Sequence, residues 1–145
     1  MKVHLVHHAD ALGPAVDPQR PLSRRGLEQT EWLAAAARDR GVKPDVIWHS
    51  GKLRARQTAE AFLRLCNPFA EFRMVRGLRS EDPPDWIRDM LEGEDREVLV
   101  AGHMPHIAQL SLRLGAADVI ALHGIVSLER VGERRYEERW RAQPE

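Results

Sequence analysis

The sequence predicts an α/β protein in which residues 1–145 form one domain, a three-layer α/β/α sandwich around a mostly parallel sheet. Two observations lead to this prediction. Short apolar runs alternate with longer segments that carry apolar residues at helical spacing, which is the pattern of βαβ units. Three of the apolar runs also end abruptly in polar residues, and parallel sheets bind ligands beyond the carboxyl ends of their strands. A length of 145 residues suits one hydrophobic core.

Six short segments are expected to form strands. Residues 3–6 and 98–101 are continuous apolar runs, as expected of strands buried on both faces. The last two segments flank the sequence Val-Gly-Glu at 131–133 and are expected to pair as antiparallel strands around that turn. The expected strands are residues 3–6, 45–48, 72–75, 98–101, 125–130 and 135–140.

Four helices are expected between these strands. Ser23 can cap the first, and Gly41 follows its last turn in the position that favours a left-handed residue. Ser50 or Gly51 can cap the second. The expected helices cover residues 23–40, 52–65, 85–92 and 105–114. Helical spacing predicts that their buried sides contain Leu27, Thr30, Leu33, Ala34, Ala37, Ala55, Ala59, Phe62, Cys66, Trp86, Ile87, Met90, Leu91, Ile107, Leu110, Ser111 and Leu114.

Polar residues follow three of the expected strands at the point where each strand ends. His7 and His8 follow the first strand, His49 and Ser50 follow the second, and His103 follows the fourth after one glycine. The carboxyl ends of parallel strands lie at the same edge of a sheet. These side chains are therefore expected to converge, although they lie far apart in the sequence.

The composition excludes several classes of protein. Lysine plus arginine equals aspartate plus glutamate, 22 of each, whereas a general nucleic-acid binder usually carries a basic excess. The single cysteine, Cys66, allows no intramolecular disulfide. No apolar run is long enough to cross a membrane, and the chain enters its first strand without a basic and apolar leader. A cytoplasmic protein without nucleic-acid or membrane partners is expected.

Four sequence blocks together resemble the histidine phosphatase superfamily, which has the phosphoglycerate mutase-like fold. They are similar to its Leu-x-Arg-His-Gly-Glu/Asp-Ala, Leu-Thr/Ser-x-x-Gly, Ser-x-x-x-Arg-Ala-x-Gln-Thr-Ala and Gly/Ser-His-x-Pro motifs. The blocks follow the family's order and cover nearly the whole chain, which is short and lacks an inserted cap, so the SixA-type phosphohistidine phosphatases are the most similar branch. The blocks are residues 5–11 (LVHHADA), 20–26 (RPLSRRG), 50–59 (SGKLRARQTA) and 102–105 (GHMP).

The resemblance implies a metal-independent phosphatase without cofactors that works through a phosphohistidine intermediate. By position, His8 would be the nucleophile, and Arg54 and His103 would hold the phosphate oxygens. A neutral imidazole is a good nucleophile and leaving group, and a hydrogen bond at its other nitrogen fixes the reactive tautomer. The planar fork of Arg54 matches two phosphate oxygens, and the start of a helix favours anions.

Two residues depart from the family's signature. His7 stands where the family has arginine, and Ala9 stands where it has glycine. His7 is expected to contact the phosphate and to assist best when protonated, at mildly acidic pH. Loss of one charge-assisted pair costs roughly 1.5–3 kcal/mol, so reduced activity is expected. Lys52, His49 and His106 are expected at the rim of the site, where they would restore positive potential.

The substrate class follows from the weakness of the acid candidates. Glu81 and Asp82 lie in the loop where members of the family often carry a general acid, but the local sequence matches poorly. Phosphomonoesters leave as alkoxides and need a proton donor, whereas phosphohistidine leaves as imidazole and needs far less help. A phosphorylated protein bearing phosphohistidine is therefore the favoured substrate, and a small phosphomonoester is the alternative.

A non-catalytic module is another alternative. Such a module would bind phosphate or a phosphoprotein through His8, Arg54 and His103 but would have lost turnover together with the arginine at position 7. Retained phosphate binding without a phosphoenzyme would identify it.

A metal hydrolase is the remaining alternative. His4, His7, His8 and Asp10 form a sequence cluster that could suggest metal ligands. Strand alternation argues against it, because His7 and His8 point to opposite faces unless the chain bends. Outside that alternative, His4 and His123 are expected to have structural roles.

Overall fold

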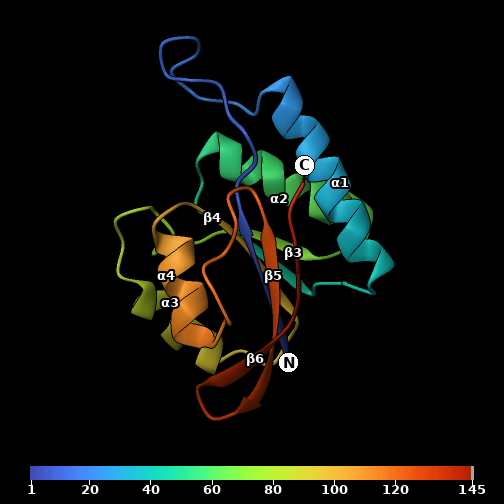
Figure 1. The fold of residues 1–145 in the computed structure, drawn as a ribbon, viewed down its shortest axis with the longest axis vertical. Coiled ribbons are helices and arrows are strands. Elements are labelled where there is room, and N and C mark those ends of the chain that lie inside the picture. The colour runs from blue at the N-terminus through green and yellow to red at the C-terminus, as the bar shows by residue number, and fades with distance from the viewer. Residues whose placement is uncertain (145) are drawn as a thin grey trace.

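The protein, described over residues 1–144 by a computed structural model, is built on a six-stranded sheet with the order β3-β2-β4-β1-β5-β6 (Figure 1). The strands are β1 (Lys2–His7), β2 (Val46–His49), β3 (Glu71–Met74), β4 (Val98–Gly102), β5 (Ile125–Gly132) and β6 (Arg135–Ala142). The helices are α1 (Arg24–Asp39), α2 (Leu53–Cys66), α3 (Pro84–Glu92) and α4 (His106–Leu114). The four strands from β3 to β1 run parallel, and β5 and β6 add two antiparallel pairings. The prediction of a mostly parallel sheet is confirmed.

Helices cover both faces of the sheet, which gives three layers (Figure 1). Successive residues of a strand point to opposite faces. Leu5 of β1 accordingly belongs to the core beneath α3 and α4, whereas Val6 belongs to the core beneath α1 and α2. The first core receives Ile87, Leu91, Ile107 and Leu110 from its helices, and the second receives Leu33, Ala34, Ala37, Ala59 and Phe62.

The helices and strands begin and end within two residues of the predicted positions, but three predicted core residues are exposed. Leu27, Trp86 and Met90 carry side chains that face solvent. In α3 the buried residues are Pro84, Ile87 and Leu91, which lie three and four residues apart on one side of the helix. Trp86 and Met90 each precede one of these buried residues and therefore lie about 100° around the helix from it.

The ends of two elements differ from the prediction. The turn between β5 and β6 consists of Glu133 and Arg134 rather than 131–133, because β5 continues to Gly132 and Arg134 adopts the left-handed φ of 56°. α1 is capped as predicted, since the Ser23 hydroxyl accepts a hydrogen bond from a backbone N–H of the first turn. α2 instead begins after Lys52 without a side-chain cap, so the predicted cap at 50 or 51 is wrong.

The carboxyl ends of β1, β2 and β4 lie level at one edge of the sheet. The register pairs His7 with Gly102 and His49 with Ala101. In Figure 1 this edge is at the top, beneath the long loop that follows β1, and the N-terminus lies at the opposite end. The predicted convergence of strand ends is therefore confirmed.

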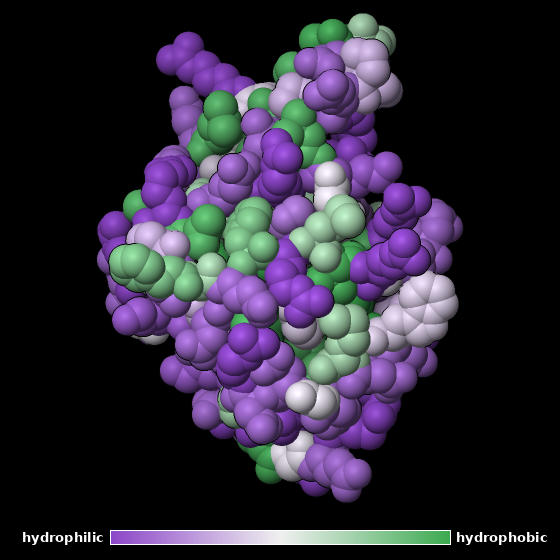
Figure 2. All heavy atoms as spheres, turned by 180° about the vertical axis from the view of Figure 1, so that it is seen from behind, coloured by the Kyte–Doolittle hydropathy of each residue, from purple (hydrophilic) through white to green (hydrophobic). Residues whose placement is uncertain are grey.

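Seen from behind, the surface is mainly hydrophilic, with hydrophobic side chains interspersed across its middle (Figure 2). None of the helices in residues 1–144 combines the length and the hydropathy that crossing a bilayer would require.

Candidate active site

His8 directly follows the central strand and is fixed through both its backbone and its ring. Its backbone N–H donates to the carbonyl of Gly102 at 3.0 Å, which ties it to the end of β4. Its ring Nδ1 lies 2.7 Å from the carbonyl oxygen of Ala9, so Nδ1 carries the proton and donates it. The neutral tautomer with a free lone pair on Nε2 is the form that can attack an electrophile.

His103 comes from the end of β4 and lies beside His8, with ring centroids 5.1 Å apart. Its Nε2 is 2.5 Å from the hydroxyl of Ser50. Both side chains are buried, and the hydrogen bond fixes the orientation of the imidazole. Ser50 is the first residue of the third sequence block, and this contact gives it the role of orienting His103.

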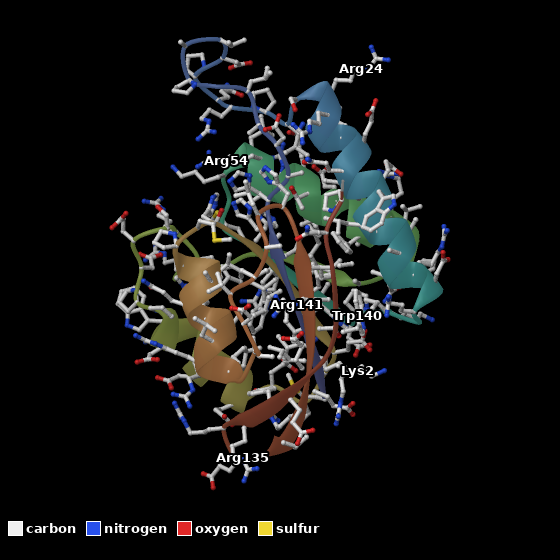
Figure 3. All side chains as sticks on the ribbon, in the orientation of Figure 1. Lys2, Arg24, Arg54, Arg135, Trp140 and Arg141 are labelled. Atoms are coloured by element: carbon white, nitrogen blue, oxygen red, sulfur yellow. The ribbon has the colours of Figure 1, made fainter. Side chains whose placement is uncertain are left out.

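Arg54 lies in the first turn of α2, at the end of the sheet opposite Lys2 (Figure 3). Its Nε is buried without a hydrogen-bond partner, and within residues 1–144 it forms no ion pair. Desolvation, followed by repulsion from Arg20, lowers its pKa. An arginine held next to three histidines and without a carboxylate is available for an anionic ligand.

A cavity of about 370 Å³ lies beside these groups, and among residues 1–144 neither His7 nor His8 belongs to its lining. His8 adjoins it through the neighbouring ring of His103. Arg54 and His103 line it, as do three residues that the sequence predicted for the rim or as an acid: Lys52, Glu81 and Asp82. The remaining lining residues are Arg79 and Ser80. Three cationic side chains against two carboxylates make this a suitable cavity for a phosphoryl group.

The loop after His8 is held by α2. The backbone N–H of Ala9 donates to the hydroxyl of Thr58 at 3.1 Å, and that hydroxyl donates to the carbonyl of Arg54 at 2.8 Å. Gln57 accepts from the backbone N–H of Leu22. The Gln-Thr pair of the third sequence block therefore positions the His8 loop against Arg54. Ala9 keeps a negative φ and is fully buried, so it fits without backbone strain.

His123 belongs to the site, although the sequence suggested only a structural role. Its backbone N–H donates to Nδ1 of His7 at 2.8 Å, and its ring Nδ1 donates to the carbonyl of His8 at 2.8 Å. The rings of His123 and His7 are stacked, 5.0 Å apart and 15° from parallel. Since Nδ1 of His7 accepts this hydrogen bond, the neutral His7 ring carries its own proton on Nε2.

Burial keeps His7, His8 and His103 neutral. Desolvation lowers the pKa of His7 to about 3, that of His8 to about 4 and that of His103 to about 3, and neighbouring cations such as Arg54 lower them further. For His8 the neutral ring is the nucleophilic form. For His7 the shift contradicts the expectation that mild acid would charge this side chain in the free protein. His7 is instead a neutral donor through Nε2–H.

Two predicted rim residues lie elsewhere. His49 is buried, accepts a hydrogen bond from Gly51 N–H through Nδ1, and packs against the ring of Phe72. His106 is fully buried, neither ring nitrogen has a hydrogen-bond partner within residues 1–144, and desolvation lowers its pKa. Neither side chain lines the cavity, because both point into the layers that pack against the sheet.

The structure also shows the surroundings of Asp82, the remaining acid candidate, and of His4, one of the residues of the metal alternative. Asp82 accepts a hydrogen bond from the backbone N–H of Arg79, which closes a turn at the cavity wall. The ring of His4 is hydrogen-bonded to Glu97 and Ser127, as expected of a structural residue. In the part of the chain that the structure describes, no three His, Cys, Asp or Glu side chains are arranged to hold a metal ion.

A family model provides the first comparison with known proteins. The model of the histidine phosphatase superfamily, branch 1, matches residues 8–87, more than half of the chain. No curated protein matched the sequence.

Solved structures provide the second comparison. The protein histidine phosphatase SixA, solved with tungstate, has a TM-score of 0.86 at 23% identity, over 99% of this chain and 97% of that one. A protein from Agrobacterium tumefaciens assigned as the phosphohistidine phosphatase SixA has a TM-score of 0.82 at 23% identity, over 99% and 98% of the two chains. Phosphoserine phosphatase from Entamoeba histolytica, solved with 3-phosphoglyceric acid, has a TM-score of 0.65 at 14% identity, over 88% and 90%. These similarities show a shared fold.

Proposed function

Because this chain belongs to the histidine phosphatase superfamily, we propose that it is a phosphatase that removes the phosphoryl group from protein phosphohistidine through a phospho-His8 intermediate. One observation carries the proposal. His8 is held neutral, with Nδ1–H bonded to the carbonyl of Ala9, beside an Arg54 that has no partner among residues 1–144. A nucleophile beside His103, and an anion-binding arginine that lines one cavity with His103, are the two parts that phosphoryl transfer requires.

The reaction has two steps. Nε2 of His8 attacks phosphorus, the P–N bond of the substrate breaks, and the leaving imidazole takes a proton from solvent or from a group at the rim. Water then attacks the phosphorus of phospho-His8, the new P–N bond breaks, and inorganic phosphate leaves. The guanidinium of Arg54, a ring N–H of His103 and Nε2–H of His7 donate to the equatorial oxygens, where charge develops.

The neutral state of His8 matters for both steps. A protonated imidazole has no lone pair to attack, so an ordinary pKa of 6.5 would lose nucleophile in mild acid. With a pKa of about 4, His8 stays reactive well below neutrality. The hydrogen bond from His8 Nδ1–H to the carbonyl oxygen of Ala9 also stabilises the positive charge that the ring carries once Nε2 is phosphorylated.

The site favours a substrate that needs little acid catalysis. Glu81 is exposed, and Asp82 is engaged by the backbone of Arg79, so neither carboxyl is held against the nucleophile. An alkoxide leaving group would require such an acid, whereas an imidazole leaving group does not. SixA, which shares this fold, is described as a protein histidine phosphatase, and this supports the same substrate class.

Single-turnover labelling tests the proposal. Radiolabelled phosphoramidate is mixed with wild-type protein and with His8→Ala between about pH 5 and pH 8, which brackets the usual histidine pKa. We expect an acid-labile, alkali-stable phosphoenzyme in the wild type only, with tungstate as competitor. A chelator should leave the labelling unchanged.

The same experiment separates the alternative. If phosphate or tungstate binds but no phosphoenzyme forms at any pH, the chain is a phosphate-binding module. If labelling persists in His8→Ala, the nucleophile is a different residue, and circular dichroism of the variant shows whether it is folded.

A further inference from the structure

We propose that a groove beside the phosphate cavity binds the polypeptide that flanks the phosphohistidine, and that it selects an apolar residue accompanied by carboxylates. We call it the flanking groove and define it by Met74, Arg76, Arg79 and Trp86. The inference rests on the proposed function, since it names the recognition element of that substrate. It assigns a role to Trp86 and Arg76, which the mechanism does not use.

The flanking groove adjoins the phosphate cavity. It has a volume of about 430 Å³, and Arg79 and Asp82 line both spaces. The wall between them is a turn closed by reciprocal bonds between these two residues, with N–H of Arg79 on the Asp82 carboxylate and N–H of Asp82 on the Arg79 carbonyl. Ser50, which bonds His103, also lines the groove. A chain that places its phosphoryl group at His8 therefore has a second space directly beside it.

The groove offers apolar surface that is held in place. The side chains of Met74 and Trp86 are 65% and 56% exposed, although both are large and apolar. Trp86 packs over Gly77, where an added Cβ would lie 3.5 Å from its Cβ, and Met74 packs over Gly51 in the turn that leads to Arg54. An exposed tryptophan against a fixed backbone is a typical anchor for binding, because little conformational entropy is lost.

The charge of the groove indicates the rest of the partner. Arg76 and Arg79 line it and form no ion pair with any residue in 1–144, whereas Arg64 and Arg141 elsewhere on the surface are held by carboxylates. Unpaired guanidinium groups favour partner carboxylates. The occupant that fits is an acidic polypeptide segment with one apolar side chain on Trp86.

Peptide substrates test this inference. One phosphohistidine peptide carries Leu and Glu beside the phosphohistidine, and a matched peptide carries Gly and Lys there. Wild type should prefer the Leu-Glu peptide, and free phosphoramidate gives the reference rate. In Trp86→Ala, the ratio of kcat/KM for that peptide to kcat/KM for phosphoramidate should fall about ten-fold. Arg76→Glu should shift the preference toward the Lys peptide.

Matched controls come from the opposite layer. Trp32 on α1 is 49% exposed and Arg24 is fully solvated, so Trp32→Ala and Arg24→Glu should leave both ratios unchanged. Equal kcat/KM for the two peptides in wild type, or equal loss in Trp32→Ala and Trp86→Ala, would overturn the inference. If the protein forms no phospho-His8, calorimetric binding of the unphosphorylated peptides still decides: preferential binding of the Leu-Glu peptide that Trp86→Ala abolishes supports the groove, and no preference overturns it.

Discussion

At position 7 a neutral imidazole occupies the place where the family has a guanidinium. The backbone of His123 fixes its tautomer, and the stacked ring of His123 holds its plane. Nε2–H of His7 therefore offers one hydrogen bond without a full charge. The cations of the cavity are Arg54, Lys52 and Arg79.

His7→Ala should lower kcat/KM for phosphoramidate about two- to ten-fold, because a neutral hydrogen bond is worth about 0.5–1.5 kcal/mol. The loss should be the same at pH 5 and at pH 8, since the pKa of His7, about 3, lies below that range. Steady-state rates at both pH values measure it. A loss that grows toward pH 5 would show that His7 acts as a cation.

Arg54→Lys should lower kcat/KM about ten- to a hundred-fold, because the positive charge remains but the bidentate fork is lost. Arg56→Lys is the matched control, two residues along the same helix, where the side chain is exposed and faces Glu60. Phosphoramidate hydrolysis measures both variants. Equal activity of Arg54→Lys and wild type would remove Arg54 from the phosphate site.

The sequence predicted the residues that carry motifs but not the residues that position them. His8, Arg54 and His103 could be proposed because each lies in a block that resembles a family motif, at the end of a strand or the start of a helix. His123 could not, because it lies in coil before β5 and reaches the site only through the pairing of β5 with β1. His106 was expected at the rim because it lies near His103 in sequence, but the first turn of α4 rotates its ring inward.

At the scale of elements, α1 is attached directly to the catalytic loop. Gly26 in its first turn lies against Asp10, two residues after His8, and an added Cβ would be 1.9 Å from the Asp10 carbonyl oxygen. Ser23 bonds the same carbonyl through its backbone N–H and the carboxylate through its hydroxyl. Ser23 and Gly26 of the Ser-x-x-Gly block therefore hold the loop that follows His8 against the start of α1.

Gly26→Ala should reduce the free energy of unfolding by about 1–3 kcal/mol, because the helix must move away from Asp10. Urea denaturation measures this. Gly13→Ala, where an added Cβ meets no atom within 4 Å, is the control and should change stability by less than about 0.5 kcal/mol. If both variants unfold at the same urea concentration, the close approach of Gly26 to Asp10 is not needed.

Element positions were predictable because apolar period and capping signals are local properties. Which apolar residues of a helix face the core was not predictable, because it depends on how much of the helix surface packs against the sheet. The buried side of α3 consists of Pro84, Ile87 and Leu91, so Trp86 remains outside and becomes available to the flanking groove. The order of the strands could not be predicted from local sequence either, because β4 lies between β1 and β2 in the sheet.

At the scale of the whole molecule, burial of neutral histidines links stability to pH. The pKa values of His7, His8 and His103 are about 3, 4 and 3 in the fold, against 6.5 for an unperturbed histidine. Below pH 6.5 the unfolded chain binds protons that the folded protein does not, so the free energy of unfolding falls as the pH falls. The contribution of these histidines to stability is fully present above about pH 6.5.

Each of the three histidines should contribute a slope of up to about 1.4 kcal/mol per pH unit between pH 6.5 and about pH 4. The urea midpoint should therefore decrease from pH 7 to pH 5, above the range in which carboxylates titrate. His103→Gln should reduce this slope, and saturating tungstate should oppose the decrease. A midpoint that stays constant from pH 7 to pH 5 would contradict neutral burial.

The position of β1 in the sheet has a further consequence. It is paired on both sides, to β4 and to β5, and the N–H of His8 extends this pairing onto Gly102. Amide hydrogens of β1 should therefore exchange with deuterium only when the whole sheet opens, later than those of the edge strands β3 and β6. His8, the proposed nucleophile, is attached to the segment that resists local fluctuation longest, so activity and fold should disappear in a single cooperative transition on heating.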